Sequence, residues 1–521
     1  MSDMLATLVM LLGLDPESSI DADLAYLRHN LSKHLWHTYL RTSIFKTMTA
    51  VKSVAVIGAG PSGAAAAEAL RRTNAFDTIK VFERRSEVGG AWNFDPDPDV
   101  PPADPLVHPS LVDPPVQPPI QLPARTAKQE RVQRWTTAPV YETLTTNVNV
   151  DIMSYTYVHF SEVDKTPPAE NPDPMFPSAA RVLKYIQALH ARHSDCLVLN
   201  TTVERASKDD AKWNLALRRS DPDTDYWYQE SFDALVVASG IYWVPKIPSI
   251  PGLREYNQKF PGRALHSKYF RAVDTYKTKT VLIVGNGITA LDLIRDLMPV
   301  VSHLTISHRS VNWMYPTSLE GVDGISVRSE LSHIDSVTGD YFFKDGDSPI
   351  RPDSIIFATG YHVSFPFLSP PQASHNYDPS FTADWVPGTY LHTFWRDDPT
   401  LSFVGLVQNS VSFRIFEYQA AIVASHLAGR LKLPPMSEME DWEKKRLAEV
   451  DHNTALFHYN KYPGSVEFLN RLHSILASAG SSGLRLLEWQ DAWTPRYLAG
   501  IHERRRRVDN LKTLHLTGSV V

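Results

Sequence analysis

A short stretch near the start of the chain constrains its fold more than any other. Residues 54–57 form an apolar run that is typical of a buried parallel strand, and the glycines after it have the spacing G-x-G-x-x-G. Gly58 permits the tight turn, Gly60 lets the backbone approach a pyrophosphate, and Gly63 lets the next helix, expected over residues 64–72, pack on the strand. The free N–H groups at the start of that helix attract phosphate. The sequence therefore predicts a Rossmann-like unit that binds a dinucleotide.

The second expected strand of this unit, residues 78–82, ends in an acidic residue, Glu83. A carboxylate at this position accepts hydrogen bonds from a ribose 2′-hydroxyl and repels a 2′-phosphate. The first site should therefore prefer FAD or NAD to NADP. A tight glycine turn without a ligand is the alternative, and the succession of strand, turn, helix, strand and acid argues against it.

The same scheme recurs later in the chain. A strand expected over residues 280–284 is followed by Gly285 and Gly287, a helix, and a strand over residues 303–307. Arg309 stands where the first unit has its acid, and a cation suits the 2′-phosphate of NADPH. We therefore assign the second site to NADPH.

Cysteine usage and charge exclude several classes of protein. Cys196 is the only cysteine among 521 residues, so no internal disulfide can form and a reducing, cytoplasmic compartment is expected. Disulfide reductases with two dinucleotide sites are excluded because they need a cysteine pair. The net charge of −6 gives no reason to expect a nucleic-acid partner. No stretch is long and apolar enough to cross a membrane, so no membrane partner is expected.

Three segments lie outside this scheme. Residues 1–47 carry leucines at helical spacing, and two interpretations stay open: a docked helical extension, or an overrun of the gene model. Residues 95–139 are rich in proline, which predicts an extended surface loop that wraps the domain, with a ligand for a signalling domain as the alternative. Residues 504–507 are four consecutive arginines, for which a solvated helix face is expected.

Further motifs point to one family. Residues 260–270 have the sequence F-P-G-R-A-L-H-S-K-Y-F, which fits the signature F-x-G-x-x-x-H-x-x-x-[YF]. G-G-A-W at residues 89–92, T-A-L-D at residues 289–292 and A-T-G-Y at residues 358–361 are similar to motifs of the same family. With these motifs, over roughly residues 51–435, the chain resembles the flavin-containing monooxygenases, and its proline-rich insert is similar to the fungal branch.

The resemblance implies a fold, two cofactors and a reaction. It implies an α/β fold of two Rossmann-like dinucleotide-binding domains, the NADPH domain being inserted into the FAD domain. The implied reaction uses NADPH and O2, through a C4a-hydroperoxyflavin, to oxygenate a nitrogen or sulfur of a small-molecule amine, thiol or thioether in natural-product biosynthesis. The expected division is residues 1–47 (extension), 48–240 (FAD domain, first part), 241–357 (NADPH domain), 358–500 (FAD domain, second part) and 501–521 (tail). A homodimer is one possible assembly.

The resemblance also assigns roles to residues. Asn147 is the implied catalytic residue, beside the reactive edge of the flavin, and a turn asparagine is the alternative. His266 of the signature is expected to serve linker geometry and not to act as a base. No metal site is implied. The cofactor-binding residues are Gly58, Gly60, Pro61, Ser62, Gly63, Glu83, Gly90, Ala91, Trp92, Thr146, Asn147, Val203, Gly285, Gly287, Thr289, Ala290, Leu291, Asp292 and Arg309.

Two other functions stay open at this point. The Baeyer–Villiger relatives are expected to carry a tryptophan four residues after the signature histidine, where this chain has Phe270 followed by Arg271. The sequence therefore favours oxygenation of a heteroatom over insertion of oxygen next to a carbonyl carbon. A non-catalytic flavin- and NADPH-binding regulator is the other alternative, and the complete second glycine motif argues against it.

Overall fold

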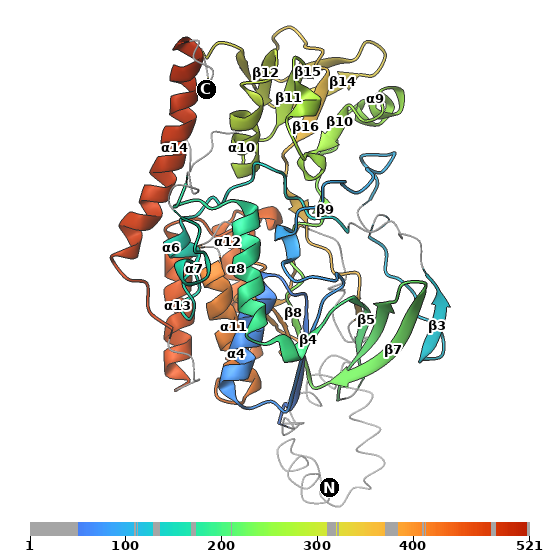
Figure 1. Cartoon of the computed structure of the whole chain (residues 1–521), viewed down its shortest axis with the longest axis vertical. Coiled ribbons are helices and arrows are strands. Elements are labelled where there is room, and N and C mark those ends of the chain that lie inside the picture. Colours follow the sequence, from blue (N-terminus) through green and yellow to red (C-terminus); the bar gives the residue numbers. More distant parts are fainter. Residues whose placement is uncertain are drawn as a thin grey trace, which may run out of the picture. The chain divides into compact units, whose positions relative to one another are not determined.

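The computed structural model describes residues 50–108, 111, 113–128, 136–167, 173–209, 211–309, 319, 322–369, 384–408, 411, 413–480 and 486–517. Lys52–Val521 make up one compact unit, which carries all the labelled elements in Figure 1. The helix expected within residues 1–47 lies outside the described residues.

The first sheet is the mainly parallel sheet that the leading glycine motif predicts. In spatial order its strands are β19 (Thr389–Tyr390), β20 (Phe394–Trp395), β21 (Leu401–Phe403), β8 (Ala234–Val237), β1 (Ser53–Ile57), β2 (Thr78–Phe82) and β4 (Leu197–Val198). β1 pairs in parallel with β2 and β8, and β21 pairs in parallel with β8. The chain therefore returns to this sheet after the second glycine motif.

Helix α4 (Pro61–Thr73) follows the first glycine turn and packs on β1 and β2, with α8 (Ala179–Ala191) and α11 (Phe413–Leu427) beside it (Figure 1). Ala64 and Ala66 of α4 are each 2% exposed, and Ala67 is 1% exposed. Because methyl side chains are short, α4 can lie close to the sheet and to α11 at once. This close packing fixes the N-terminus of α4, where the first site is expected.

A second sheet lies against the first. Its strands, in spatial order, are β18 (Leu368–Ser369), β5 (Thr201–Lys208), β6 (Trp213–Ser220), β7 (Thr224–Phe232) and β3 (Ala124–Ala127). β6 and β7 form an antiparallel hairpin. Trp213 and Leu215 of β6 share one apolar core with Ala55 and Ile57 of β1. The second sheet therefore holds β1, and the glycine turn after it, in place.

The second glycine motif belongs to a separate parallel sheet. In spatial order its strands are β10 (Ala264–His266), β16 (Ser354–Phe357), β11 (Thr280–Val284), β12 (His303–Ser307) and β13 (Ile325–Arg328), and all neighbouring pairs are parallel. Helix α10 (Ile288–Leu297) follows β11 and packs in the core of this domain. Two Rossmann-like domains, one inserted into the other, are therefore confirmed.

The inserted domain also carries α9 (Leu253–Lys259) and the antiparallel pair β14 (Leu331–Asp335) and β15 (Asp340–Phe343). The chain enters and leaves this domain through β9 (Val244–Pro245) and β17 (Tyr361–His362), which pair with each other. The remaining short turns are η1 (Gly90–Trp92), α6 (Val150–Met153), α7 (Phe160–Val163), η3 (Ser194–Cys196), η4 (Ser267–Tyr269), η5 (Asp274–Tyr276) and η6 (Thr454–Leu456).

The described part of the proline-rich segment, residues 95–139, packs along both domains. Its strand β3 pairs with β7 of the second sheet. Four of its aspartates bind residues outside the segment: Asp95 binds Arg85 at 2.7 Å, Asp99 binds Lys268 at 3.3 Å, Asp104 binds Arg254 at 2.9 Å and Asp113 accepts from Ser364 at 2.7 Å. These contacts are those of a loop that wraps the domains.

Three helices close the chain: α12 (Met436–Glu449), α13 (Gly464–Ser478) and α14 (Trp493–Thr517). α13 packs on α11, and α14 contacts α6 and α10. α14 runs without a break through residues 500–501, where the sequence predicts the start of a tail. Arg506, within the run of arginines, is exposed and pairs with Glu503 at 2.8 Å. Within the described residues, no helix has both the length and the apolar character needed to cross a membrane.

Candidate active site

The turn after β1 can be built only with glycine at two positions. Gly58 has a φ of +104°, and a Cβ there would lie 2.7 Å from the carbonyl oxygen of Ala238 at the end of β8. A Cβ on Gly63 would lie 2.0 Å from the carbonyl oxygen of Gly58. Both distances are below the closest approach of real Cβ atoms, so the strand, the turn and α4 meet without side chains between them.

The start of α4 leaves its backbone donors free of side-chain caps. Gly60 is the N-cap residue, and no side chain caps the helix. Gly60 also touches a second glycine turn, because a Cβ on Gly90 would lie 2.9 Å from the Gly60 Cα. An uncapped helix N-terminus between two glycine turns fits a pyrophosphate, which takes its hydrogen bonds from backbone N–H groups.

Glu83 is held next to the glycine turn. Its Oε2 accepts a hydrogen bond from the Ala59 backbone N–H at 2.9 Å, and its Oε1 accepts one from the Arg85 N–H at 2.9 Å. The side chain is 5% exposed. The carboxylate therefore has a fixed orientation at the end of β2, as recognition of a ribose hydroxyl requires.

His190 on α8 supports the same turn and was not singled out by the sequence. Its Nε2 lies 3.0 Å from the carbonyl oxygen of Gly60, and this oxygen can only accept, so Nε2 carries the proton. Burial lowers the pKa of His190 to about 4, more than the hydrogen bond to Gly60 raises it. The imidazole is therefore neutral near pH 7. No motif marks His190, because it lies far from Gly60 in the sequence.

These elements surround a cavity of about 310 Å³. It brings together ten of the predicted site residues: Gly58, Gly60, Pro61, Ser62, Glu83, Gly90, Ala91, Trp92, Asn147 and Val203. Gly63 and Thr146 do not line it. Gly63 packs inside the turn, and the Thr146 hydroxyl, in a residue that is 2% exposed, donates to the carbonyl oxygen of Val148 at 3.0 Å.

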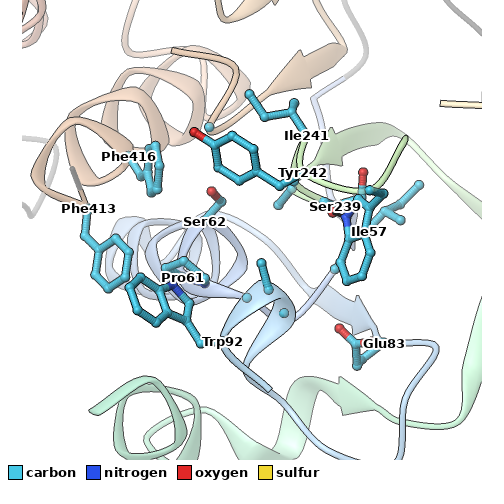
Figure 2. A pocket seen from close by; sticks show the side chains of 18 of the residues that line it. Ile57, Pro61, Ser62, Glu83, Trp92, Ser239, Ile241, Tyr242, Phe413 and Phe416 are labelled. Atoms are coloured by element: carbon cyan, nitrogen blue, oxygen red, sulfur yellow. Dashed lines mark hydrogen bonds between the residues drawn. The ribbon is translucent and has the colours of Figure 1, made fainter. Parts of the chain in front are cut away.

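Aromatic side chains that the sequence analysis did not name form one wall of this cavity. Phe413 of α11 meets Trp92 edge to face, with ring centroids 6.0 Å apart, and Phe416 lies 6.1 Å from Phe413. Figure 2 shows Trp92, Phe413 and Phe416 on one side of Pro61, with Glu83 on the other. The cavity therefore has a polar end near Glu83 and an aromatic end near Trp92.

The second glycine motif repeats the geometry of the first. Gly285 has a φ of +125°, and a Cβ there would lie 2.4 Å from the carbonyl oxygen of Ala358. A Cβ on Gly287 would meet nothing within 4 Å, and this glycine starts α10 without a side-chain cap. The open helix N-terminus fits a second pyrophosphate. Arg309 follows β12 and is exposed, and Thr289 is partly buried.

Three predicted residues of the second motif have side chains inside the domain. Ala290 and Leu291 are buried in its apolar core. Asp292 accepts a hydrogen bond from the Tyr141 hydroxyl at 3.0 Å. Because these three side chains lie inside the domain, any contact of these residues with a nucleotide would involve the backbone. None of the second motif's residues lines the cavity described above.

His266 of the signature connects the two linkers between the domains. Its Nε2 donates to the carbonyl oxygen of Gly360 at 2.8 Å, and its Nδ1 accepts from the Lys268 N–H at 3.1 Å. Burial lowers the pKa of His266 to about 3. The His266 imidazole is therefore neutral and makes a hydrogen bond through each of its two nitrogens, which fits a role in linker geometry. Among the described residues, no group of three or more His, Cys, Asp or Glu side chains could hold a metal ion.

Comparison with known families identifies this arrangement. The profile of the family described as flavin-binding monooxygenase-like matches residues 129–324 and 320–481, which is more than half of the chain. The chain belongs to this family. The profile of an NAD(P)-binding Rossmann-like domain matches residues 56–108. The predicted family is therefore confirmed, with FAD and NADPH as the cofactors of this flavin-binding monooxygenase.

Individual relatives are similar over most of their length. Flavin-containing monooxygenase ustF2 of Aspergillus flavus is 29% identical over 445 residues, which cover 76% of this chain and 86% of that protein. Flavin-containing monooxygenase FMO GS-OX5 of Arabidopsis thaliana is 31% identical over 396 residues, which cover 74% of this chain and 76% of that protein.

Solved structures show the same fold. S-allyl-L-cysteine S-oxygenase from Allium sativum has a TM-score of 0.70 at 25% identity, and the match covers 88% of this chain and 94% of that chain. An open crystal structure of cyclohexanone monooxygenase has a TM-score of 0.52 at 14% identity, and the match covers 84% of this chain and 98% of that chain. The second likeness shows the fold alone.

Proposed function

We propose that this flavin-binding monooxygenase uses NADPH and O2 to transfer one oxygen atom to a nitrogen or sulfur of a small molecule. The observation that carries the proposal is the cavity, which runs from the first glycine turn and Glu83 to Trp92, Asn147 and an aromatic wall. The similarity to an S-oxygenase of Allium sativum supports sulfur as one of the atoms oxidised.

The reaction balances without any further reactant. NADPH and a proton supply two electrons, one atom of O2 bonds to the lone pair of the sulfur or nitrogen, and the other atom leaves as water. When bound, FAD accepts the hydride and activates O2. The residues of this chain then have to hold the two nucleotides, orient the substrate and exclude water.

Each of these tasks has candidate residues. The uncapped start of α4 would bind the FAD pyrophosphate, and Glu83 the ribose. The start of α10 and Arg309 would bind NADPH. Trp92 and Phe413 would exclude water from the aromatic end, which protects a reactive oxygen species from wasteful release as peroxide.

Asn147 would supply a hydrogen bond at the aromatic end of the cavity. It lines the cavity beside Val148 and is partly buried. A carboxamide both donates and accepts, so Asn147 could hydrogen-bond the nicotinamide and the flavin, when these are bound, without changing its own protonation. No acid or base of the protein is needed next to the substrate, because the oxidant is activated before the substrate reacts.

The deciding experiment is anaerobic reduction of the purified holoprotein by NADPH, followed by addition of O2 and a sulfide or a tertiary amine. We expect the flavin to bleach, NADPH to be consumed, and one sulfoxide or N-oxide to form per NADPH. A lactone from a ketone, with no sulfoxide or N-oxide, would instead establish the Baeyer–Villiger reaction. No bleaching by NADPH would establish a non-catalytic role.

A further inference from the structure

The last helix of the chain contributes to the cavity wall. Tyr497, Gly500 and Ile501 of α14 line the cavity, together with Asn147 and Trp92. The match to the family profile ends at residue 481, and α14 begins at Trp493. This part of the wall therefore lies outside the segment by which the family is defined.

A buried arginine holds the start of α14 against the rest of the site. Arg414, next to Phe413 on α11, is 4% exposed, and its guanidinium carbon lies 4.1 Å from the centre of the Trp493 ring. The same guanidinium donates to the carbonyl oxygens of Asp151 at 2.9 Å and Ile152 at 3.1 Å, in α6. One cation thus fastens α14 to α11 and to the segment that follows Asn147.

Further contacts fix the Tyr497 ring and place Gly500 beside the Asn147 turn. The Tyr497 ring lies 5.5 Å from the Tyr462 ring, and the residue is only 5% exposed, so its orientation is fixed by packing. A Cβ on Gly500 would lie 3.6 Å from the Phe176 ring and 3.7 Å from Asn149. The helix backbone therefore lies against the residues that follow Asn147.

The residues that line the cavity together with Asn147 and α14 include a group of apolar and aromatic side chains: Trp92, Val148, Val407, Phe413 and Phe416. An apolar wall discriminates between substrates by their size and shape.

We propose that α14 is the substrate-side wall of the cavity and that Tyr497 limits the size of the substrate. This inference rests on the proposed function. It goes beyond that function by naming the residue that selects the substrate by size. Tyr497 would contact the substrate through its ring, since the aromatic face supplies most of its contact area.

The test compares two neutral sulfides of different size. Methyl phenyl sulfide is the small substrate and methyl 2-naphthyl sulfide the large one, with kcat/KM measured by sulfoxide formation in the holoenzyme. Tyr497→Ala should raise the ratio of large to small by about tenfold or more, because size discrimination in apolar pockets reaches about 10- to 200-fold. Tyr497→Leu should raise it less, and Tyr497→Phe, which keeps the ring, should preserve the ratio. Arg506→Ala, an exposed change on the same helix, should not alter the ratio.

If the FAD-loaded enzyme oxidises neither sulfides nor amines with NADPH, the proposed function itself fails, before any variant is compared.

Flavin content and the rate of flavin reduction by NADPH, measured without substrate, separate selectivity from damage. If Tyr497→Ala and Tyr497→Leu keep their flavin and the ratio stays at the wild-type value, the proposed role of Tyr497 is overturned. If both variants lose flavin while Tyr497→Phe keeps it, Tyr497 serves cofactor retention and the role in selectivity is overturned as well.

Discussion

Glu83 follows β2 directly and Arg309 is the second residue after β12, one position further along than Glu83. Their opposite charges are proposed to distinguish the two nucleotides. Glu83 is buried and bonded to two backbone N–H groups, so its charge is fixed next to the first glycine turn. Arg309 is exposed, as expected of a side chain that has to reach a phosphate from solution. The cofactor preference of each domain is therefore proposed to depend on one charged residue.

Replacing Arg309 by alanine should weaken NADPH much more than NADH. A charge-assisted hydrogen bond contributes about 1.5–3 kcal/mol, so kcat/KM for flavin reduction by NADPH should fall roughly 10- to 150-fold, while the value for NADH stays nearly constant. Arg351→Ala is the matched control, because Arg351 is also an exposed arginine of this domain and pairs with Asp340 at 2.9 Å. Equal losses for both nucleotides would contradict the assignment of the second site.

Replacing Asn147 by alanine should uncouple the enzyme. We expect NADPH consumption to continue while hydrogen peroxide replaces the oxygenated product, because the amide hydrogen bond at the aromatic end is lost. Peroxide and product, each measured per NADPH, give the result directly. Unchanged coupling would mean that Asn147 serves only the local turn.

At the scale of single residues, the sequence predicts those residues whose role depends on neighbours close by in the sequence. Gly58, Gly63 and Glu83 belong to one unit of strand, turn and strand, so their spacing alone indicates their geometry. His190 and Phe413 could not be predicted, because each reaches the turn or the cavity from a helix far along the chain. Only the packing of α8 and α11 beside α4 brings them there.

Among the elements, α11 serves both the cavity and the core. Phe413 and Phe416 face the cavity, whereas Glu417 is 2% exposed and accepts hydrogen bonds from the backbone N–H and the hydroxyl of Thr156. Burial raises the pKa of Glu417 to about 7, despite these hydrogen bonds and the nearby Arg414. The helix thus carries a carboxyl group that is largely protonated in mildly acidic solution.

The pH dependence of stability should reveal this group. The folded protein binds the proton of Glu417 more tightly than the unfolded chain does, so its contribution to stability is lost as the pH rises from about 4.5 to about 7. The difference in unfolding free energy between wild type and Glu417→Gln should therefore shift against the wild type by on the order of 3 kcal/mol between pH 4.5 and pH 8. Denaturant melts at several pH values give this difference.

Glu68 supplies the contrast to Glu417. It is also buried, with 3% of its surface exposed, but the Nε2 atom of His193 lies 2.6 Å from its Oε2. Burial raises the pKa of Glu68, and the hydrogen bonds from His193 and Arg192 outweigh that effect and lower it. Glu68→Gln should therefore not reproduce the shift between pH 4.5 and pH 8. A flat difference for Glu417→Gln would show that Glu417 is ionised in the folded protein.

Periodicity predicts the elements that carry a clear apolar pattern. The strands expected over residues 78–82, 280–284 and 303–307 match β2, β11 and β12. Of α14, only the solvated helix face at residues 504–507 was predicted, because the sequence of this helix is polar and rich in arginine and its packing contacts lie near its start.

At the scale of the whole molecule, the proline-rich segment is fastened to the inserted domain through a buried ion pair. Lys268 of the signature is 0% exposed, lies 3.3 Å from Asp99 and donates to the carbonyl oxygen of Thr137. Burial lowers the pKa of Lys268 to about 8, although Asp99 opposes this effect. The lysine also lies 5.6 Å from the ring of Trp243, which lines the cavity.

Asp99→Asn should destabilise the protein by about 3–5 kcal/mol, because it leaves the Lys268 charge buried without its partner. Asp104→Asn is the matched control. Asp104 belongs to the same segment and pairs with Arg254 at the surface, so its loss should cost less than about 1 kcal/mol. Thermal melts of the FAD-loaded proteins measure both. Equal effects of the two variants would show that the buried pair does not fasten the segment.

The order of the two domains follows from the sequence because both glycine motifs are local patterns. The path of the proline-rich segment does not follow, since Lys268 and Arg254, the partners of Asp99 and Asp104, lie more than a hundred residues away in the sequence.

The position of α14 has a consequence for how such enzymes diversify. The nucleotide-binding turns and the helix that is proposed to select the substrate lie in different stretches of the gene. Exchange of the final segment between relatives is therefore expected to change the substrate range while the nucleotide-binding turns stay intact.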